Sequence, residues 1–341
     1  MNLQTDYLGL SLRNPLVASA GPLSQTVDGV KGLTDGGVGA VVLYSLFEEQ
    51  VRAQLEQAER DALLEEEHAD LFAEATSYFP AVAAEAVETV AVQYLTLVER
   101  ASAAVDVPLI ASLNGSSLGS WVQFARQLGE AGAAALELNI YLVPGDTTLT
   151  GTEVEQRHLD IVAAVKQNVN IPVAVKLAPY FSSFGSFATR LVEAGADGLV
   201  LFNRFLQPDV DVDRVEVVPG VELSNRSEAR LPRTWIAALR RRLPVSLAAT
   251  SGVEDAEDVV AYLLAGADVV MTTSALVRHG RDYSRVLLDG LATWLDRKGF
   301  ASVDAARGLL AVPADTDAAG YQRAGYVTAL EKAKSRYGSL T

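Results

Sequence analysis

The sequence predicts a (β/α)8 TIM barrel of the α/β class, and three observations support this fold. Eight short apolar runs alternate with helical segments over roughly 250 residues or slightly more, the usual length of such a barrel. The runs are continuous, as in parallel strands that are buried on both faces. The first run is followed by SAGPLSQT, which lacks the glycine-rich fingerprint that a doubly wound dinucleotide-binding sheet would carry there.

Two local signals mark the starts of the eight strands. Four segments share a pattern in which a helix ends at glycine and an apolar run begins a few residues later: DGGVGAVVLYS, EAGAAALELN, EAGADGLVLFN and LAGADVVMTTS. Glycine favours this position because it adopts the left-handed geometry that closes a helix. The other four runs begin at Pro15, Pro108, Pro172 and Pro244, and proline at the first position of a strand costs no ladder hydrogen bond.

Helical segments are expected to connect these strands. They cover residues 27–34, 82–104, 121–131, 153–167, 187–193, 234–242, 255–264 and 283–297. Each segment follows one apolar run, so the chain repeats a strand, a loop and a helix eight times.

Two further segments exceed the barrel repeat. Residues 47–80 follow the second strand and are acidic, with ERDALLEEEHADLFAE spaced like an amphipathic helix. We expect a solvated helical insertion there, and its place after the second strand also allows a lid over the barrel mouth. Residues 301–341 are expected to form a helical appendage that packs on the barrel or on a second subunit. The domain prediction is therefore a barrel over residues 1–300 and an appendage over 301–341.

The composition excludes several classes of function. The formal net charge of -15 repels the phosphates of nucleic acids and anionic lipids, so neither is expected as a partner. The chain has no cysteine, which excludes disulfides, thiolate zinc sites, iron–sulfur clusters and a cysteine nucleophile. Its three histidines, His68, His158 and His279, lack metal-ligand spacing, so we expect no metal site and place each at the surface or an interface. The N-terminus does not resemble a signal peptide and no apolar stretch reaches membrane-spanning length, so a soluble cytoplasmic protein is expected.

The candidate site lies at the C-terminal ends of the strands, where this fold builds its active sites. Those ends carry amides, hydroxyls, glycines and one lysine. In chain order they are Ser19, Ala20, Gly21, Tyr44, Ser45, Asn114, Gly115, Asn139, Lys176, Asn203, Thr250, Ser251, Gly252, Thr272, Thr273 and Ser274. A single polar residue at a strand end often only caps the next helix. Three asparagines and a buried lysine together, however, would be costly to desolvate without a polar ligand.

The loops after the seventh and eighth strands favour a phosphate. They read TSG and TTS, and barrels often bind phosphate at these two loops with hydroxyls, backbone N–H groups and a helix N-terminus. A phosphorylated, ring-bearing ligand such as flavin mononucleotide (FMN) fits this arrangement. Lys176 would then lie near the N1–O2 side of the ring, where an ammonium stabilises the negative charge of reduced flavin.

Four stretches of the sequence resemble the dihydroorotate dehydrogenase family: NPLVASAGP, ELN, PVAVKLAPY and ATSGVEDAEDVVAYLLAGADVVMTTSAL. The likeness covers residues 2–300 and implies an FMN-binding barrel that oxidises dihydroorotate to orotate in pyrimidine synthesis. It implies a set of cofactor contacts in this sequence: Ala20, Gly21, Asn114, Asn139, Lys176, Ser251, Gly252, Thr273 and Ser274. Tyr44 and Ser45, at the end of the second strand, are further candidate cofactor contacts. One departure is VELSNRSE, near Leu223 and Ser224, where the family usually has a Gly-Gly pair.

The substrate half of the family pattern is not retained. The resemblance implies a Ser or Cys base after the fourth strand, but Leu142 stands at or near that position, and its side chain cannot accept a proton. Tyr141 is the nearest ionisable group, and a phenol is a poor base. Tyr44 stands where the family has a substrate-binding lysine. The family's substrate loop is replaced by ATSYFPAV, with Ser77 as a candidate substrate contact, while Asn203 matches a substrate-binding amide.

The leading hypothesis is therefore an FMN-binding oxidoreductase of dihydroorotate dehydrogenase type that acts on another small molecule or has lost turnover. One alternative is an authentic dihydroorotate dehydrogenase with a displaced base. Others are a binding or regulatory barrel without flavin, and an aldolase that forms a Schiff base at Lys176. Because the chain has no cysteine for a cluster, electrons would leave through a soluble acceptor or a partner protein, and a homodimer is suggested by analogy alone.

Overall fold

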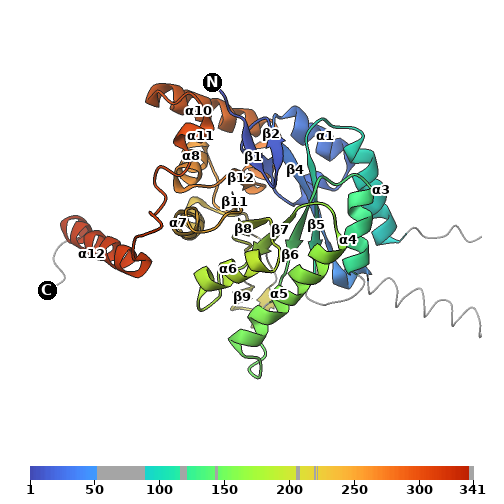
Figure 1. Cartoon of the computed structure of the whole chain (residues 1–341), viewed down its shortest axis with the longest axis horizontal. Helices are drawn as coiled ribbons and strands as arrows, with labels where there is room; N and C mark the ends of the chain where they lie inside the picture. Colours follow the sequence, from blue (N-terminus) through green and yellow to red (C-terminus); the bar gives the residue numbers. More distant parts are fainter. Residues whose placement is uncertain are drawn as a thin grey trace, which may run out of the picture.

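The barrel is formed by eight parallel strands that close on themselves (Figure 1). The computed structural model describes residues 1–51, 89–115, 121–142, 145–204, 208–218, 220 and 222–337. Around the barrel the strands are β3 (Leu16–Ala18), β4 (Ala40–Phe47), β5 (Leu109–Asn114), β6 (Ala135–Asn139), β7 (Val173–Leu177), β8 (Gly198–Leu201), β11 (Ser246–Ala249) and β12 (Val269–Thr272). The predicted fold class and each of the eight predicted strands are confirmed.

The helices pack around the outside of this barrel (Figure 1). The eight that correspond to predicted segments are α1 (Val27–Asp35), α3 (Val90–Ser102), α4 (Trp121–Glu130), α5 (Gly151–Asn168), α6 (Phe184–Glu193), α7 (Arg230–Leu239), α8 (Ala256–Ala265) and α10 (Tyr283–Lys298). Three others, α9 (Ser274–His279), α11 (Val303–Ala306) and α12 (Ala318–Tyr337), follow the last strand. The predicted acidic insertion lies outside the described residues from residue 52 onward.

The glycines that precede four of the strands have the predicted left-handed geometry. Gly37, Gly132, Gly195 and Gly266 have φ angles of 106°, 105°, 109° and 118°. At Gly266 the amide N–H donates to the carbonyls of Tyr262 and Leu263, which closes α8 and turns the chain toward β12.

A short hairpin closes the N-terminal end of the barrel. It consists of β1 (Thr5–Tyr7) and β2 (Leu10–Leu12), and the Leu8 amide donates to the Ser246 hydroxyl at the start of β11. Tyr7, Leu8 and Leu12 are buried in one cluster with small and branched side chains of the barrel interior. The lower part of the interior is therefore apolar, and polar side chains begin one layer closer to the mouth.

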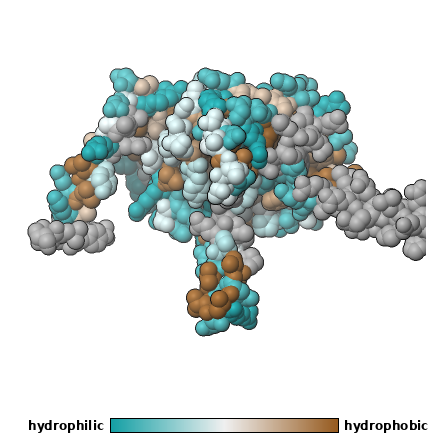
Figure 2. Space-filling model, turned by 90° about the horizontal axis from the view of Figure 1, so that it is seen from below, coloured by the Kyte–Doolittle hydropathy of each residue, from teal (hydrophilic) through white to brown (hydrophobic). Residues whose placement is uncertain are grey.

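Two segments extend away from the barrel. The hairpin of β9 (Asp209–Asp211) and β10 (Glu216–Val218) is the narrow projection in Figure 2, on which apolar side chains gather. Helix α12 stands off the barrel in Figure 1, and its side chains Tyr326, Val327 and Leu330 are exposed. The tail was predicted to pack on the barrel or on a second subunit. These three side chains do not pack on the barrel within the described residues.

Within the described residues, no helix combines the length and the apolar character that a bilayer span requires.

The expected surface or interface position is wrong for His158, which is buried on the inner face of α5. Its ring packs edge-on against Phe181 and Phe187 at centroid distances of 5.3 and 5.6 Å. Its Nδ1–H donates to the Val154 carbonyl over 2.8 Å. An imidazole with one satisfied N–H is apolar enough to fill this aromatic cluster.

Stability should depend on the protonation of His158. Burial lowers the pKa of this imidazole below its usual value of 6.5, so the unfolded chain binds the proton more readily than the folded chain. The contribution is fully present above about pH 6.5 and is lost as the pH falls through the lowered pKa of the folded state. We expect urea denaturation to give a free energy of unfolding that declines from about pH 7.5 to about pH 5.5. This component should disappear in His158→Gln and persist in His279→Gln; equal pH dependence in all three proteins would contradict it.

Candidate functional site

A cavity of about 140 Å³ opens at the C-terminal ends of β3, β7, β8, β11 and β12. Its lining contains several of the predicted site residues: Ala20, Lys176, Asn203, Ser251, Thr273 and Ser274. It also contains Arg204 and Ser224, which were not predicted as contacts. Among the described residues that line this cavity there is no Asp, Glu or His. The strand-end residues of β3, β7, β8, β11 and β12 therefore meet in one space, and hydroxyl groups dominate it.

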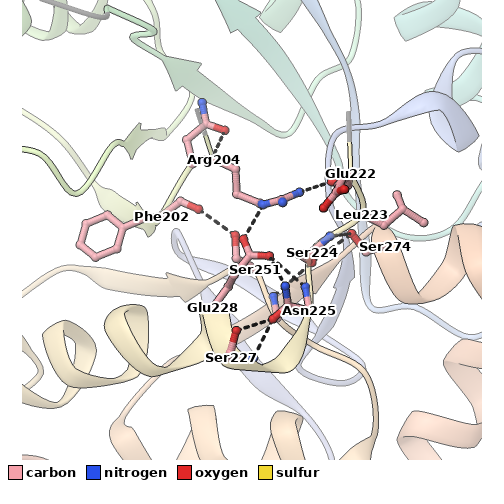
Figure 3. Close-up of polar contacts among 12 residues, drawn as sticks. Phe202, Arg204, Glu222, Leu223, Ser224, Asn225, Ser227, Glu228, Ser251 and Ser274 are labelled. Atoms are coloured by element: carbon pink, nitrogen blue, oxygen red, sulfur yellow. Dashed lines mark hydrogen bonds and ion pairs between the residues drawn. The ribbon is translucent and has the colours of Figure 1, made fainter. Parts of the chain in front are cut away.

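Ser224 links the loops that follow β8, β11 and β12 (Figure 3). Its amide and its hydroxyl both donate to Ser274 Oγ, over 3.1 and 3.0 Å. Its own Oγ accepts the Gly252 amide at 3.2 Å. Since Ser274 Oγ accepts two hydrogen bonds here, its hydrogen stays available for an acceptor in the cavity.

Two predicted glycines allow close approach of backbone at this site. A Cβ on Gly21 would lie 2.6 Å from Thr273 Cγ2, and the Thr273 hydroxyl donates to the Ser19 carbonyl over 2.7 Å. Gly252 has a φ of +70°, and a Cβ there would lie 2.5 Å from the Ala229 amide nitrogen. Glycine is therefore required at both positions for the loops to pack as they do.

Lys176 lies inside the barrel mouth and is paired with Glu137. The distance from Lys176 Nζ to Glu137 Oε1 is 3.2 Å, and both side chains are buried. Ser112 Oγ also donates to this carboxylate oxygen, over 3.4 Å. Glu137 was missed as a site residue, although the ELN stretch contained the signal: it stands two residues before Asn139, so both side chains face the barrel interior.

The predicted asparagines are brought close together but contribute unequally to the cavity. Asn203 Nδ2 donates to Asn139 Oδ1 over 2.9 Å. Asn114 and Asn139 are buried partners in the ladder between β5 and β6. Asn203 alone among the three lines the cavity.

Tyr44 points away from the cavity because β4 contains a bulge. The pairing of β4 with β5 shifts between Val42 and Ser45, so one extra residue is inserted. The Tyr44 ring packs against Tyr94 of α3 at a centroid distance of 5.0 Å, and Tyr94 Oη donates to the Tyr44 carbonyl. Ser45 faces the interior and shares a 2.8 Å hydrogen bond with Ser112. Neither Tyr44 nor Ser45 lines the cavity.

The candidate base positions Tyr141 and Leu142 do not line the described cavity either. Tyr141 and Leu142 follow the buried Ile140, are themselves partly buried, and are absent from the cavity lining. Ser77 lies outside the described residues.

A second cation, Arg204, stands one residue beyond Asn203. Its Nε donates to Glu228 Oε2, and its guanidinium also donates to the Glu222 carbonyl (Figure 3). It thereby braces the segment that carries Ser224. This role was difficult to predict, because Arg204 lies past the strand end, where the loop conformation decides the direction of its side chain.

Comparison with known proteins decides the family. The family model described as dihydroorotate dehydrogenase matches residues 82–295, which is more than half of the chain. The chain belongs to the dihydroorotate dehydrogenase family.

Two dihydroorotate dehydrogenase relatives illustrate the range of similarity. The catalytic subunit of dihydroorotate dehydrogenase B (NAD(+)) from Methanothermobacter thermautotrophicus is 27% identical over 315 residues, covering 90% of this chain and 98% of that protein. A protein from Aeropyrum pernix, provisionally named dihydroorotate dehydrogenase A (fumarate), is 32% identical over 207 residues. That match covers 58% of this chain and 66% of the relative, just under two thirds of its length.

Crowding at Gly252 should make this position of the candidate site intolerant of a side chain. Gly299→Ala is a matched control, because Gly299 has a φ of +75° and an added Cβ there would meet nothing within 4 Å. Left-handed strain should cost Gly299→Ala about 1–2 kcal/mol in free energy of unfolding. Gly252→Ala should lose a further 1–3 kcal/mol or so from overpacking against Ala229, as measured by urea denaturation. Equal losses of free energy of unfolding in the two variants would show that the Gly252 loop moves to accommodate the added Cβ without further cost.

Proposed function

We propose that this chain is an FMN-binding flavoprotein of dihydroorotate dehydrogenase type whose substrate site has diverged. One observation carries the proposal: a single cavity at the barrel mouth is lined by the ammonium of Lys176 and by the hydroxyls of the β11 and β12 loops. Membership of the family supports it. The flavin site is assigned to the barrel over residues 1–300, and residues 301–341 are treated as an appendage.

The hydroxyl end of the cavity suits the phosphate of FMN. Ser274 retains a hydrogen for donation. The Ser251 and Thr273 hydroxyls line the same space but donate their hydrogens to the carbonyls of Phe202 and Ser19. Phosphate oxygens are strong acceptors, and hydrogen bonds to a charged acceptor are stronger than those between neutral groups. The backbone contact at Gly252 and the Thr273 side chain packed on Gly21 form the cradle, and Ser224 fixes its three loops relative to one another.

The other end of the cavity suits the ring. Lys176 would stabilise negative charge at the N1–O2 side, and the amides of Asn139 and Asn203 would orient the ring and exclude water. When bound, FMN would supply a hydride acceptor, which the protein side chains lack. We also propose that electrons leave to a soluble acceptor or a partner protein, and that two copies of the chain form a homodimer.

The side chains of the described site supply no proton acceptor for dihydroorotate. Leu142 cannot accept a proton, Tyr44 faces α3, and the cavity lining lacks Asp, Glu and His within the described residues. Loss of a general base typically slows a reaction by a factor of about 10²–10⁴. We therefore propose slow or absent dihydroorotate oxidation and a different small-molecule redox substrate. Schiff-base chemistry is a weaker candidate, because its lysine must be uncharged and Lys176 is held in an ion pair.

The visible spectrum of the purified protein tests this function. We expect a yellow protein whose flavin band is bleached by dihydroorotate slowly or not at all under anaerobic conditions. Bleaching within a normal turnover time, or rescue of a pyrimidine auxotroph, would instead support an authentic dihydroorotate dehydrogenase with a displaced base. A colourless protein that takes up no FMN would support a non-enzymatic barrel.

Variants of the cavity should weaken FMN binding, which fluorescence titration measures. Ser274→Ala removes a donor to a charged group and should lower the affinity about ten- to hundredfold. Lys176→Met should also lower it, whereas Lys166→Met should not. Lys166 is the matched control because it pairs with Asp197 at the opposite end of the barrel. Equal affinities in all three variants would place the ligand elsewhere.

A further inference from the structure

The buried carboxylate of Glu137 has an incomplete set of partners. Glu137 is 0% exposed, and its Oε1 accepts hydrogen bonds from Lys176 Nζ and Ser112 Oγ. Within the described part of the chain, its Oε2 has no hydrogen-bond partner. Burying a charge is expensive, and a pair of apolar side chains of similar volume is often at least as stable as a buried ion pair. Core stability therefore does not explain why a carboxylate stands at this position.

A second buried polar group lies below Glu137 in the same interior. Tyr7 Oη also has no partner within the described residues, and the phenol comes from the hairpin that closes the barrel. Burial raises the pKa of Tyr7, and the negative charge of Glu137 raises it further, so Tyr7 is a neutral donor in electrostatic range of Glu137. Among the described residues, the cation that contacts Glu137 is thus Lys176 on the mouth side, and Tyr7 brings no positive charge from below.

The register of the strands explains why Glu137 acts on Lys176. Asn139 is the ladder partner of Lys176, and Glu137 stands two residues earlier on the same face of β6. Lys176 therefore reaches back from the mouth toward the layer beneath it to make the 3.2 Å contact. An ammonium held in this way has one fixed position and a neighbouring opposite charge.

We propose that Glu137 is a positioning residue for the cofactor site: it fixes Lys176 and offsets its charge, so that Lys176 presents an ion pair and not a lone cation to the flavin ring. This inference rests on the proposed flavin function. The negative charge of Glu137 would limit how strongly Lys176 stabilises negative charge on the flavin ring. Removing the carboxylate charge should therefore make the flavin easier to reduce.

Sulfite binding and the midpoint potential of the flavin report this charge without any substrate. Sulfite adds to N5 of oxidised flavin and places negative charge on the N1–O2 side, so a stronger local cation tightens its binding. We expect Glu137→Gln to tighten sulfite binding about tenfold or more, since a full charge is removed close to the ring. The midpoint potential should rise, by about 30 mV for each tenfold change in the two-electron equilibrium. Ser112→Ala, which removes an uncharged contact to the same oxygen, should change both values little.

The effect should require Lys176. In a Lys176→Met background there is no ammonium for Glu137 to fix or offset, so adding Glu137→Gln should change both measurements much less than it does beside Lys176. Unchanged sulfite affinity in Glu137→Gln, or an equal effect in the two backgrounds, would overturn the proposal.

A stability cycle tests the ion pair independently of any cofactor. Denaturation of flavin-free Glu137→Gln, Lys176→Met and the double variant should give non-additive losses, with a coupling of about fivefold or more in the unfolding equilibrium constant. Glu137→Leu with Lys176→Met should fold even if a single variant does not, because no charge is left unpaired. Additive losses would overturn the pairing. Coupling in a protein that binds no FMN would support the ion pair while refuting the flavin function.

Discussion

The ion pair between Lys176 and Glu137 is the interaction on which the candidate site depends. It forms where the interior of the barrel changes from apolar to polar, one layer above the cluster that Tyr7, Leu8 and Leu12 close from below. Alternation of side chains along the strands produces this layering, because every second residue faces the interior. A single charged side chain in that layer would be left without a partner in a low-dielectric space, so the lysine and the glutamate each depend on the other.

The opposite side of the mouth depends on the packing of its loops. Ser224 ties three loops by hydrogen bonds to Ser274 and Gly252. Gly252 lets its backbone approach that of Ala229, and Gly21 leaves room for the Thr273 side chain. Arg204 then braces the Ser224 segment from the end of β8. A rigid group of hydroxyls beside a buried ion pair suits a ligand with one anionic end and one planar end. Both halves of the site therefore support the proposed binding of FMN.

Most of the fold could be predicted from the sequence, since continuous apolar runs, strand-initial prolines and helix-closing glycines each act locally. The strand-end rule also found Lys176, Ser251, Thr273 and Ser274, because the C-terminal end of a strand fixes where its last side chain lies. The rule failed for Tyr44 because an inserted residue in β4 reverses the direction of its side chain. No local sequence pattern predicts such a bulge. Glu137 was not predicted as a site residue, and His158 was predicted at the surface or an interface. Both were wrong because the partners of these side chains come from elements distant in the sequence.

The β9–β10 hairpin is two-sided, with Val210 opposite Val217 and Asp211 opposite Glu216. Arg214 bridges the two acidic residues at the tip of the ribbon. A projecting two-stranded ribbon has free edges, and free edges with valine side chains invite neighbouring molecules to add strands. The charges along this ribbon oppose such edge-to-edge growth, so neutralising Asp211 and Glu216 would turn a protected edge into a nucleus for aggregation.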